Sequence, residues 1–97
     1  MKNIGWHASE NSDMYYVYIL ESEKDGKLYK GFTRDLKKRI EQHNSGENRS
    51  TNQRGPWKLI HYEAFINKED ALEREKFFKS GWGRNHLQKI LSNYFNK

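Results

Sequence analysis

The sequence predicts an α+β domain with a small three-stranded antiparallel sheet flanked by helices, in the order β-β-α-β-α-α. Two aromatic and β-branched stretches, residues 15–20 and 27–32, are separated by an Asp-Gly turn signal and predict a hairpin. A third such stretch covers residues 57–65. The segments before and after it have the apolar spacing of helices. A hairpin and a third strand that are covered by helices define this fold class.

The hairpin begins with YYVYIL and returns as KLYKGF. Because side chains alternate along a strand, Tyr16 and Tyr18 are expected on one face of the sheet and Val17 on the other. Tyr29 lies on the paired strand. Gly31 follows it closely, and a glycine inside a strand permits close approach by a ligand or another backbone.

The first helix is expected over residues 34–44, where Leu36, Ile40 and His43 recur at helical spacing. Residues 45–56 (SGENRSTNQRGP) are expected to form a polar loop without a core residue.

Two further helices are expected after the third strand. The first covers residues 68 to about 79, and the second covers residues 84–95. Gly81 and Gly83 are expected to separate them.

The length of 97 residues fits one domain, which we expect to cover residues 14–97 after a flexible leader at residues 1–13. There are no cysteines, so disulfides and thiolate metal sites are excluded. No apolar run approaches the roughly 20 residues that a membrane span needs. We therefore expect a cytoplasmic protein without a membrane partner.

The formal net charge is +5, and the basic residues are concentrated in two stretches. A clustered positive field of this kind attracts a phosphate backbone. The candidates for nucleic-acid binding are Lys30, Arg34, Lys37, Lys38, Arg49, Arg54 and Lys58.

Three polar residues are predicted to share faces with core residues. Successive helical residues are about 100° apart, so His43 points with Leu36, and Arg39 lies beside them. Arg39 could instead be an arginine whose apolar stem packs while its guanidinium reaches water. His43 could instead be a half-buried histidine with its hydrogen bonds satisfied. Glu75 is predicted in the middle of an apolar stripe on its helix. A buried carboxylate needs a cation, so a metal site and a salt bridge to Arg39 or another arginine remain equal alternatives.

The residues named so far resemble the GIY-YIG nuclease superfamily, in particular small stand-alone bacterial members related to the nuclease domain of the excision-repair incision subunit. The resemblance covers about residues 14–90. Its elements occur in family order as Tyr16-Val17-Tyr18, Tyr29-Lys30-Gly31, Thr33, Leu36, Arg39, His43-Asn44, Glu75 and the tail at residues 79–84. Tyr16 stands where the family name has its first glycine, and Lys30 stands where an apolar residue is usual.

The resemblance implies an endonuclease that hydrolyses phosphodiester bonds in DNA with one divalent cation, Mg²⁺ or Mn²⁺. Tyr18 and Tyr29 would activate or orient the attacking water. A free tyrosine is a weak base, so Tyr18 would need a cation that lowers its pKa, or would pass its proton to His43. Arg39 would contact the scissile phosphate, and Glu75 would hold the metal.

We expect no separate DNA-targeting module beside this one domain, so the implied activity is structure-selective or weakly sequence-specific. Branched or damaged DNA and a repair-protein partner are the expected partners. The alternative is a DNA-binding or repair-associated module of the same fold that has lost useful catalysis. A protein-interaction domain that uses an exposed tryptophan is a third possibility. The oligomeric state stays open.

Overall fold

The computed structural model describes residues 13–47, 51 and 54–96. The predicted leader lies outside these residues except for Asp13, so its flexibility stays a prediction. The elements in chain order are β1 (Tyr15–Ser22), β2 (Leu28–Thr33), α2 (Leu36–Ser45), β3 (Trp57–Phe65), α3 (Lys68–Phe78), α4 (Gly81–Ile90) and α5 (Ser92–Phe95).

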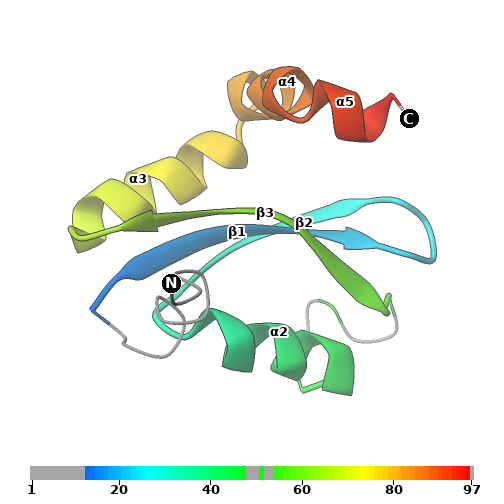
Figure 1. Ribbon diagram of the computed structural model, residues 1–97, viewed down its shortest axis with the longest axis horizontal. Helices are drawn as coiled ribbons and strands as arrows, with labels where there is room; N and C mark the ends of the chain where they lie inside the picture. Colours follow the sequence, from blue (N-terminus) through cyan, green and yellow to red (C-terminus); the bar gives the residue numbers. More distant parts are fainter. Residues whose placement is uncertain (1–12, 48–50, 52–53, 97) are drawn as a thin grey trace, which may run out of the picture.

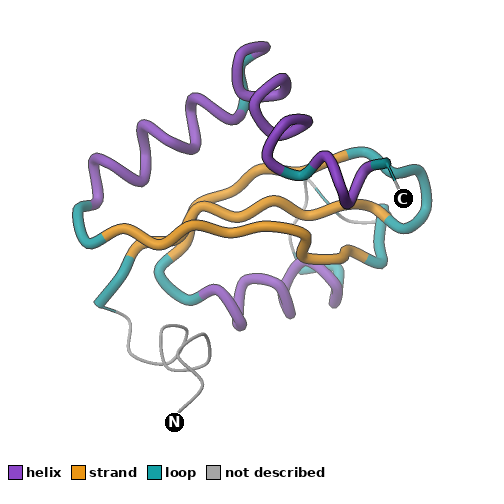
Figure 2. Tube along the Cα trace, turned by 45° about the horizontal axis from the view of Figure 1, so that its top comes forward, coloured by secondary structure: helices purple, strands orange, loops and turns teal. Residues whose placement is uncertain are grey.

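The three strands form one antiparallel sheet in the order β2-β1-β3, so β1 is the central strand. In Figure 1, α2 covers one face of the sheet, while α3, α4 and α5 lie on the other face. The same three layers are visible in the rotated trace of Figure 2. The predicted fold class is confirmed.

The alternation of β1 divides the core into two clusters, one on each face of the sheet. Its residues 16–20 are all fully buried. On the α2 side the buried residues are Tyr16, Tyr18, Leu20, Leu36 and Trp57. On the α3 and α4 side they are Val17, Ile19, Ala71, Phe78 and Leu87. The central strand therefore supplies apolar side chains to both layers, as predicted from its sequence.

Both ends of α2 are capped by local chemistry. The Asp35 side chain accepts a hydrogen bond from the Lys38 backbone N–H at 3.1 Å, which satisfies one of the free donors at the helix start. At the other end, Gly46 has a φ of 84° and terminates the helix in the left-handed conformation. These caps fix the length of α2 and the direction of the residues that it carries.

The prediction of one C-terminal helix over residues 84–95 is wrong at its start and in its continuity, although the last helix does end at Phe95. α4 begins at Gly81 rather than at residue 84, because Ser80 caps it by accepting a hydrogen bond from the Gly83 N–H at 3.1 Å. It ends at Ile90, and the short helix α5 follows. Gly83 does not break the helix but packs inside it, and a Cβ there would overlap the Phe77 carbonyl oxygen.

Among the described residues, no helix is long and apolar enough to cross a membrane.

We expect Gly83→Ala to destabilise the protein by about 1–3 kcal/mol, because the added methyl would push α4 away from the end of α3. Gly81→Ala is the matched control, since its Cβ would lie 3.8 Å from the Arg84 guanidinium, which is an ordinary van der Waals contact. Urea denaturation of both variants measures the difference. Equal stability of the two variants would contradict the close packing at Gly83.

Candidate functional site

Tyr18 lies at the centre of the α2 side of the sheet and is fully buried. Its register partner on β2 is Gly31, and a Cβ on this glycine would overlap the Tyr18 ring. The absence of a side chain at position 31 therefore lets the Tyr18 ring lie across the edge strand. The glycine inside the strand predicted a close approach by a ligand or another backbone, and here it is the Tyr18 side chain that approaches.

The Tyr18 hydroxyl and His43 Nε2 share a hydrogen bond of 2.8 Å. On the other side of the ring, His43 Nδ1 and Thr51 Oγ1 share a hydrogen bond of 2.7 Å. Burial, followed by the charge of Arg39, lowers the pKa of His43 to about 4. At neutral pH the imidazole is therefore uncharged, and it links two hydroxyl groups inside the protein.

Tyr29 and Arg39 complete the α2 side of the site. The Tyr29 ring packs edge-on against His43, with 4.9 Å between ring centroids. Burial raises the pKa of the Tyr18 phenol, and Tyr29 raises it further. Arg39 lowers that pKa through its charge and a hydrogen bond, but the net direction is upward. Tyr18 is therefore a neutral phenol in the free protein at neutral pH, and its activation by a bound cation stays a prediction.

The sequence placed Glu75 in the middle of an apolar stripe, which would bury its side chain, but the side chain is only partly buried. Its side chain is 20% exposed, and Leu72 beside it on the same face is 38% exposed. The carboxylate pairs with Lys79 Nζ at 3.1 Å, one helical turn away, and not with Arg39 or another arginine as the salt-bridge alternative had it. Its charge still raises the pKa of Tyr18, so the two groups are within electrostatic reach of each other.

The donor chemistry around Glu75 fits a magnesium or manganese ion. Mg²⁺ keeps several waters and commonly uses one or two carboxylates together with substrate phosphates. The described residues contain no cluster of three or more histidine and acidic side chains that could form a complete protein cage. Lys79 is 56% exposed, so its ammonium can turn to solvent and leave the carboxylate to another cation.

Two of the motif residues, Thr33 and Asn44, anchor the two ends of α2. The Asn44 Oδ1 accepts a hydrogen bond from the Trp57 N–H at 2.6 Å, and Asn44 Nδ2 donates to the Trp57 carbonyl at 3.2 Å. Thr33 Oγ1 accepts a hydrogen bond from the Asp35 N–H at 3.1 Å. These contacts tie the helix to β3 and to β2, and so fix where His43 and Arg39 point.

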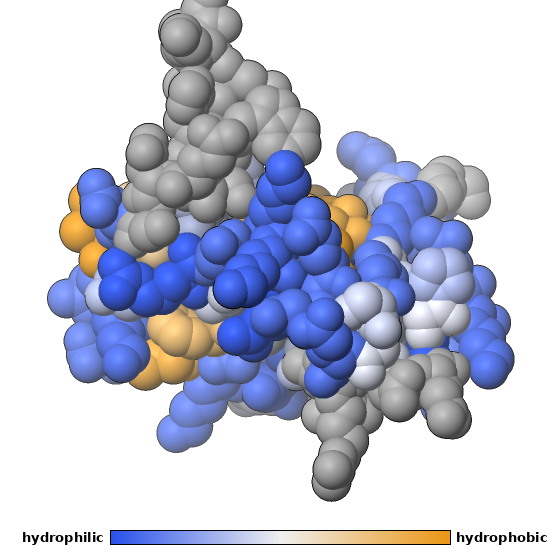
Figure 3. Space-filling model, turned by 90° about the horizontal axis from the view of Figure 1, so that it is seen from below, coloured by the Kyte–Doolittle hydropathy of each residue, from blue (hydrophilic) through white to orange (hydrophobic). Residues whose placement is uncertain are grey.

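The seven basic candidates for nucleic-acid binding do not form one surface. Lys37 and Lys38 are exposed on α2, where Figure 3 shows a largely hydrophilic face. Lys30 pairs in register with Ile19 and so lies on the opposite side of the sheet. Lys58 also lies there, 5.3 Å above the Tyr94 ring of α5.

Two other candidates are stacked on aromatic rings. Arg34 lies 4.8 Å from the centre of the Tyr15 ring, and Arg54 lies 5.0 Å from the Trp57 ring. Arg49 lies outside the described residues. The role of all seven in nucleic-acid binding stays a prediction.

Sequence reasoning missed Thr51. The loop at residues 45–56 was expected to hold no core residue, but Thr51 is only 1% exposed and supports His43. Its carbonyl also accepts a hydrogen bond from Trp57 Nε1 at 3.1 Å. A single threonine in a polar loop has no period, so no sequence signal pointed to it.

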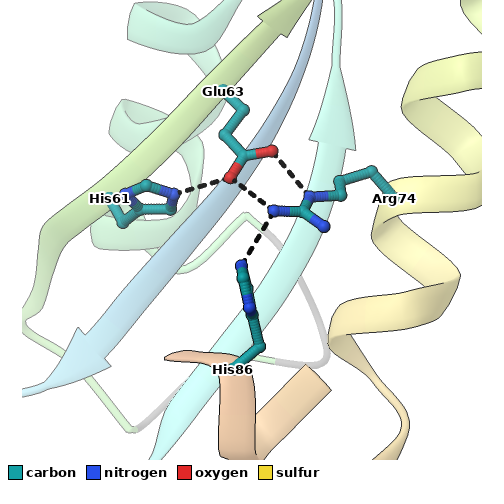
Figure 4. Close-up of polar contacts among 4 residues, drawn as sticks. All are labelled: His61, Glu63, Arg74 and His86. Carbon is teal, nitrogen blue, oxygen red and sulfur yellow. Dashed lines mark hydrogen bonds and ion pairs between the residues drawn. The ribbon is translucent and has the colours of Figure 1, made fainter. Parts of the chain in front are cut away.

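A second polar cluster, shown in Figure 4, joins β3, α3 and α4 on the far side of the sheet. Arg74 Nε donates to Glu63 Oε1 at 2.8 Å, and His61 Nε2 lies 2.9 Å from Glu63 Oε2. The Arg74 guanidinium also contacts His86 Nε2 at 3.1 Å. Arg74 stands three residues after Ala71 and four before Phe78, which is helical spacing from two core residues. This spacing could have revealed that Arg74 faces the sheet.

Comparison with known proteins agrees with this architecture. Residues 14–89 match the model of the GIY-YIG catalytic domain, and the chain belongs to the GIY-YIG family.

Similar proteins include UPF0213 proteins from several bacteria. One from Clostridium perfringens is 46% identical over 80 residues, covering 81% of this chain and 85% of the relative. One from Staphylococcus saprophyticus is 40% identical over 81 residues, covering 82% of this chain and 96% of the relative. The solution NMR structure of a UPF0213 protein from Bacillus halodurans is similar with a TM-score of 0.51 and 39% identity, covering 79% of this chain and 84% of that chain.

We expect the His43 ring to titrate near pH 4 rather than near its ordinary value of 6.5. The unfolded chain then binds the proton more tightly than the folded protein. The stabilisation from a neutral His43 is therefore fully present above pH 6.5 and is lost as the pH falls towards 4, by at most about 3 kcal/mol. NMR titration of the ring protons measures this pKa, and an inflection near pH 6.5 would contradict it.

We expect Thr51→Val to lower the free energy of unfolding by about 1–3 kcal/mol, because the buried His43 Nδ1 would lose its partner. Thr51→Ser keeps the hydroxyl and is the control for this loss. Chemical denaturation measures both variants. A valine variant as stable as the serine variant would show that the hydroxyl is not needed.

Proposed function

We propose that the protein is a metal-dependent endonuclease that hydrolyses phosphodiester bonds in DNA. The observation that carries the proposal is the hydrogen-bonded chain from Tyr18 through His43 to Thr51, with Arg39 beside the phenol and Glu75 within electrostatic reach. The family supports a nuclease in general terms. The catalytic roles and the DNA substrate are our proposal.

In this proposal Tyr18 acts as a neutral phenol, since burial raises its pKa. In the proposal Arg39, which contacts the phenol and is only partly buried, moves onto the scissile phosphate and lets the attacking water reach the Tyr18 oxygen. This oxygen accepts a proton from the water while its own proton moves to His43 Nε2, 2.8 Å away. His43 can accept this proton because its ring is neutral above about pH 4. Of the two routes that the sequence left open, we propose transfer to His43, because the Tyr18 hydroxyl is already hydrogen-bonded to His43 Nε2. The low pKa of His43 opposes this transfer in the free protein, and the negative charge of a bound phosphate would favour the protonated ring.

Arg39 binds the scissile phosphate and stabilises the negative charge that builds up in the transition state. Tyr29 packs against His43 and keeps the imidazole oriented towards Tyr18. Glu75 holds the divalent cation, Mg²⁺ or Mn²⁺, once Lys79 has turned away. Such an ion, when bound, stabilises the leaving oxygen.

The substrate proposal is structure-selective or weakly sequence-specific cleavage, including branched or damaged DNA, in the cytoplasm. Its repair context comes from the proposed relation to the nuclease domain of the excision-repair incision subunit, while the family match itself gives the GIY-YIG catalytic domain. A repair protein is a candidate partner. The competing proposal is a binding module that has the same fold but cleaves no DNA, and the following experiment separates the two.

We expect Glu75→Gln to reduce cleavage of plasmid and branched DNA at least 100-fold with Mg²⁺ or Mn²⁺, because the amide lacks the charge that holds the ion. Glu73→Gln, on the exposed side of the same helix, is the matched control and should retain full activity. A nicking assay on purified proteins measures both.

Equal cleavage by wild type and Glu75→Gln would identify a contaminating nuclease and end the proposal. Salt-dependent DNA binding without cleavage by the wild type, under all metal conditions, would favour the binding module instead.

A further inference from the structure

Trp82 is an exposed tryptophan at the start of α4. It is 79% exposed, whereas Trp57 in the core is 3% exposed. The neighbouring Gly83 is buried against the end of α3, which holds the first turn of α4 in place. An aromatic face is thus presented to solvent from a rigid position, and tryptophan is enriched at binding interfaces.

A pocket of about 370 Å³ adjoins the indole and is lined by Gly81, Trp82, Arg84 and Asn85. This volume is at the lower end of the range of ligand sites. The Arg84 guanidinium folds back over Gly81, where a Cβ would lie 3.8 Å from it. The pocket therefore combines an aromatic face, a guanidinium and an amide that can both donate and accept hydrogen bonds.

Three cations share this corner of the molecule. Arg84 lines the pocket, and Lys79 is the C-cap of α3, two residues before α4 begins at Gly81. After burial, the positive charges of Arg84 and Lys79 lower the pKa of Lys30. Lys30 and Arg84 form no ion pair with any described residue, while Lys79 pairs with Glu75. The corner is positively charged and adjoins the candidate site through the Lys79–Glu75 pair.

We propose that the Trp82 pocket binds an unpaired nucleobase stacked on the indole, while Lys30, Lys79 and Arg84 bind the phosphates on either side of it. The inference rests on the proposed function and narrows its substrate to nucleic acid with a single-stranded stretch beside the cleaved bond.

The chemistry around Trp82 favours this ligand over a protein partner. Stacking needs only the flat face of a base, so it tolerates any sequence, and cations along the backbone supply affinity. In a continuous duplex the base faces are covered by neighbouring pairs. The residues that line the pocket beside Trp82 are glycine, arginine and asparagine, which offer little apolar area to a protein partner.

The test compares the binding of three fluorescein-labelled DNAs in EDTA, where cleavage is suppressed: a single strand, a blunt duplex, and the duplex with a single-stranded tail. We expect Trp82→Ala to weaken binding of the single strand and the tailed duplex by about 10-fold or more, with at most about a 2-fold effect on the blunt duplex. Trp82→Phe should retain most of the affinity. Ile66→Ala, which removes a side chain that is 80% exposed elsewhere, is the control and should bind like wild type.

A second readout is tryptophan fluorescence. The measurement uses a Trp6→Phe background, so that only Trp57 and Trp82 emit. Single-stranded DNA should quench the exposed Trp82, and this quenching should vanish when Trp82→Phe is added, while the buried Trp57 still emits. The proposal is overturned if Trp82→Ala binds the tailed duplex as tightly as wild type, or if it weakens blunt and tailed duplexes equally.

These outcomes do not depend on catalysis. If Trp82-dependent binding of tailed DNA is found but no metal supports cleavage, the pocket is supported and the nuclease proposal fails. If cleavage depends on Glu75 but binding is indifferent to Trp82, the nuclease proposal is supported and the pocket is refuted.

Discussion

The burial of β1 on both faces is the constraint on which the rest of the structure depends. Five consecutive residues, 16–20, are removed from water, so one helical layer must cover each side of a sheet only three strands wide. The same burial encloses the hydroxyl of Tyr18. A buried hydroxyl without a partner is costly, and His43 on α2 satisfies it. The ring of His43 then needs a partner for its second nitrogen, and the loop supplies Thr51. Packing of the strand thus leads directly to the hydrogen-bonded chain in the candidate site.

The electrostatics of the site follow from the same burial. In the interior the neutral forms are favoured, so the pKa of Tyr18 rises and that of His43 falls. The charged groups, Arg39 and Glu75, are only partly buried and remain in contact with solvent. The site therefore has a neutral interior that can relay a proton and a charged margin that can meet a phosphate and a cation. This division assigns the proposed roles without requiring an ionised tyrosine in the free protein.

The sequence predicted the features that depend on local periodicity. The strands, the face of the sheet on which each β1 side chain lies, and the helix α2 could be anticipated. Each of these follows from the regular alternation or helical rotation of successive residues. Thr51 could not be anticipated, because its burial depends on a loop folding back onto His43. The start of α4 was missed for a similar reason: Gly83 had the composition of a helix breaker, and only its contact with Phe77 explains why it lies inside a helix. The partner of Glu75 was also missed, although Lys79 stands four residues after it, the spacing at which opposite charges meet on a helix. Only arginines had been weighed as its salt-bridge partner.

The pairing of Asn44 with Trp57 has a consequence for the sheet as a whole. β3 is an edge strand, and edge strands expose backbone groups that can recruit a strand from another molecule. The Asn44 amide occupies both the N–H and the C=O of Trp57 with the pattern that a neighbouring strand would use. One side chain therefore imitates a fourth strand for a single residue, and at that position it protects the sheet from edge-to-edge aggregation.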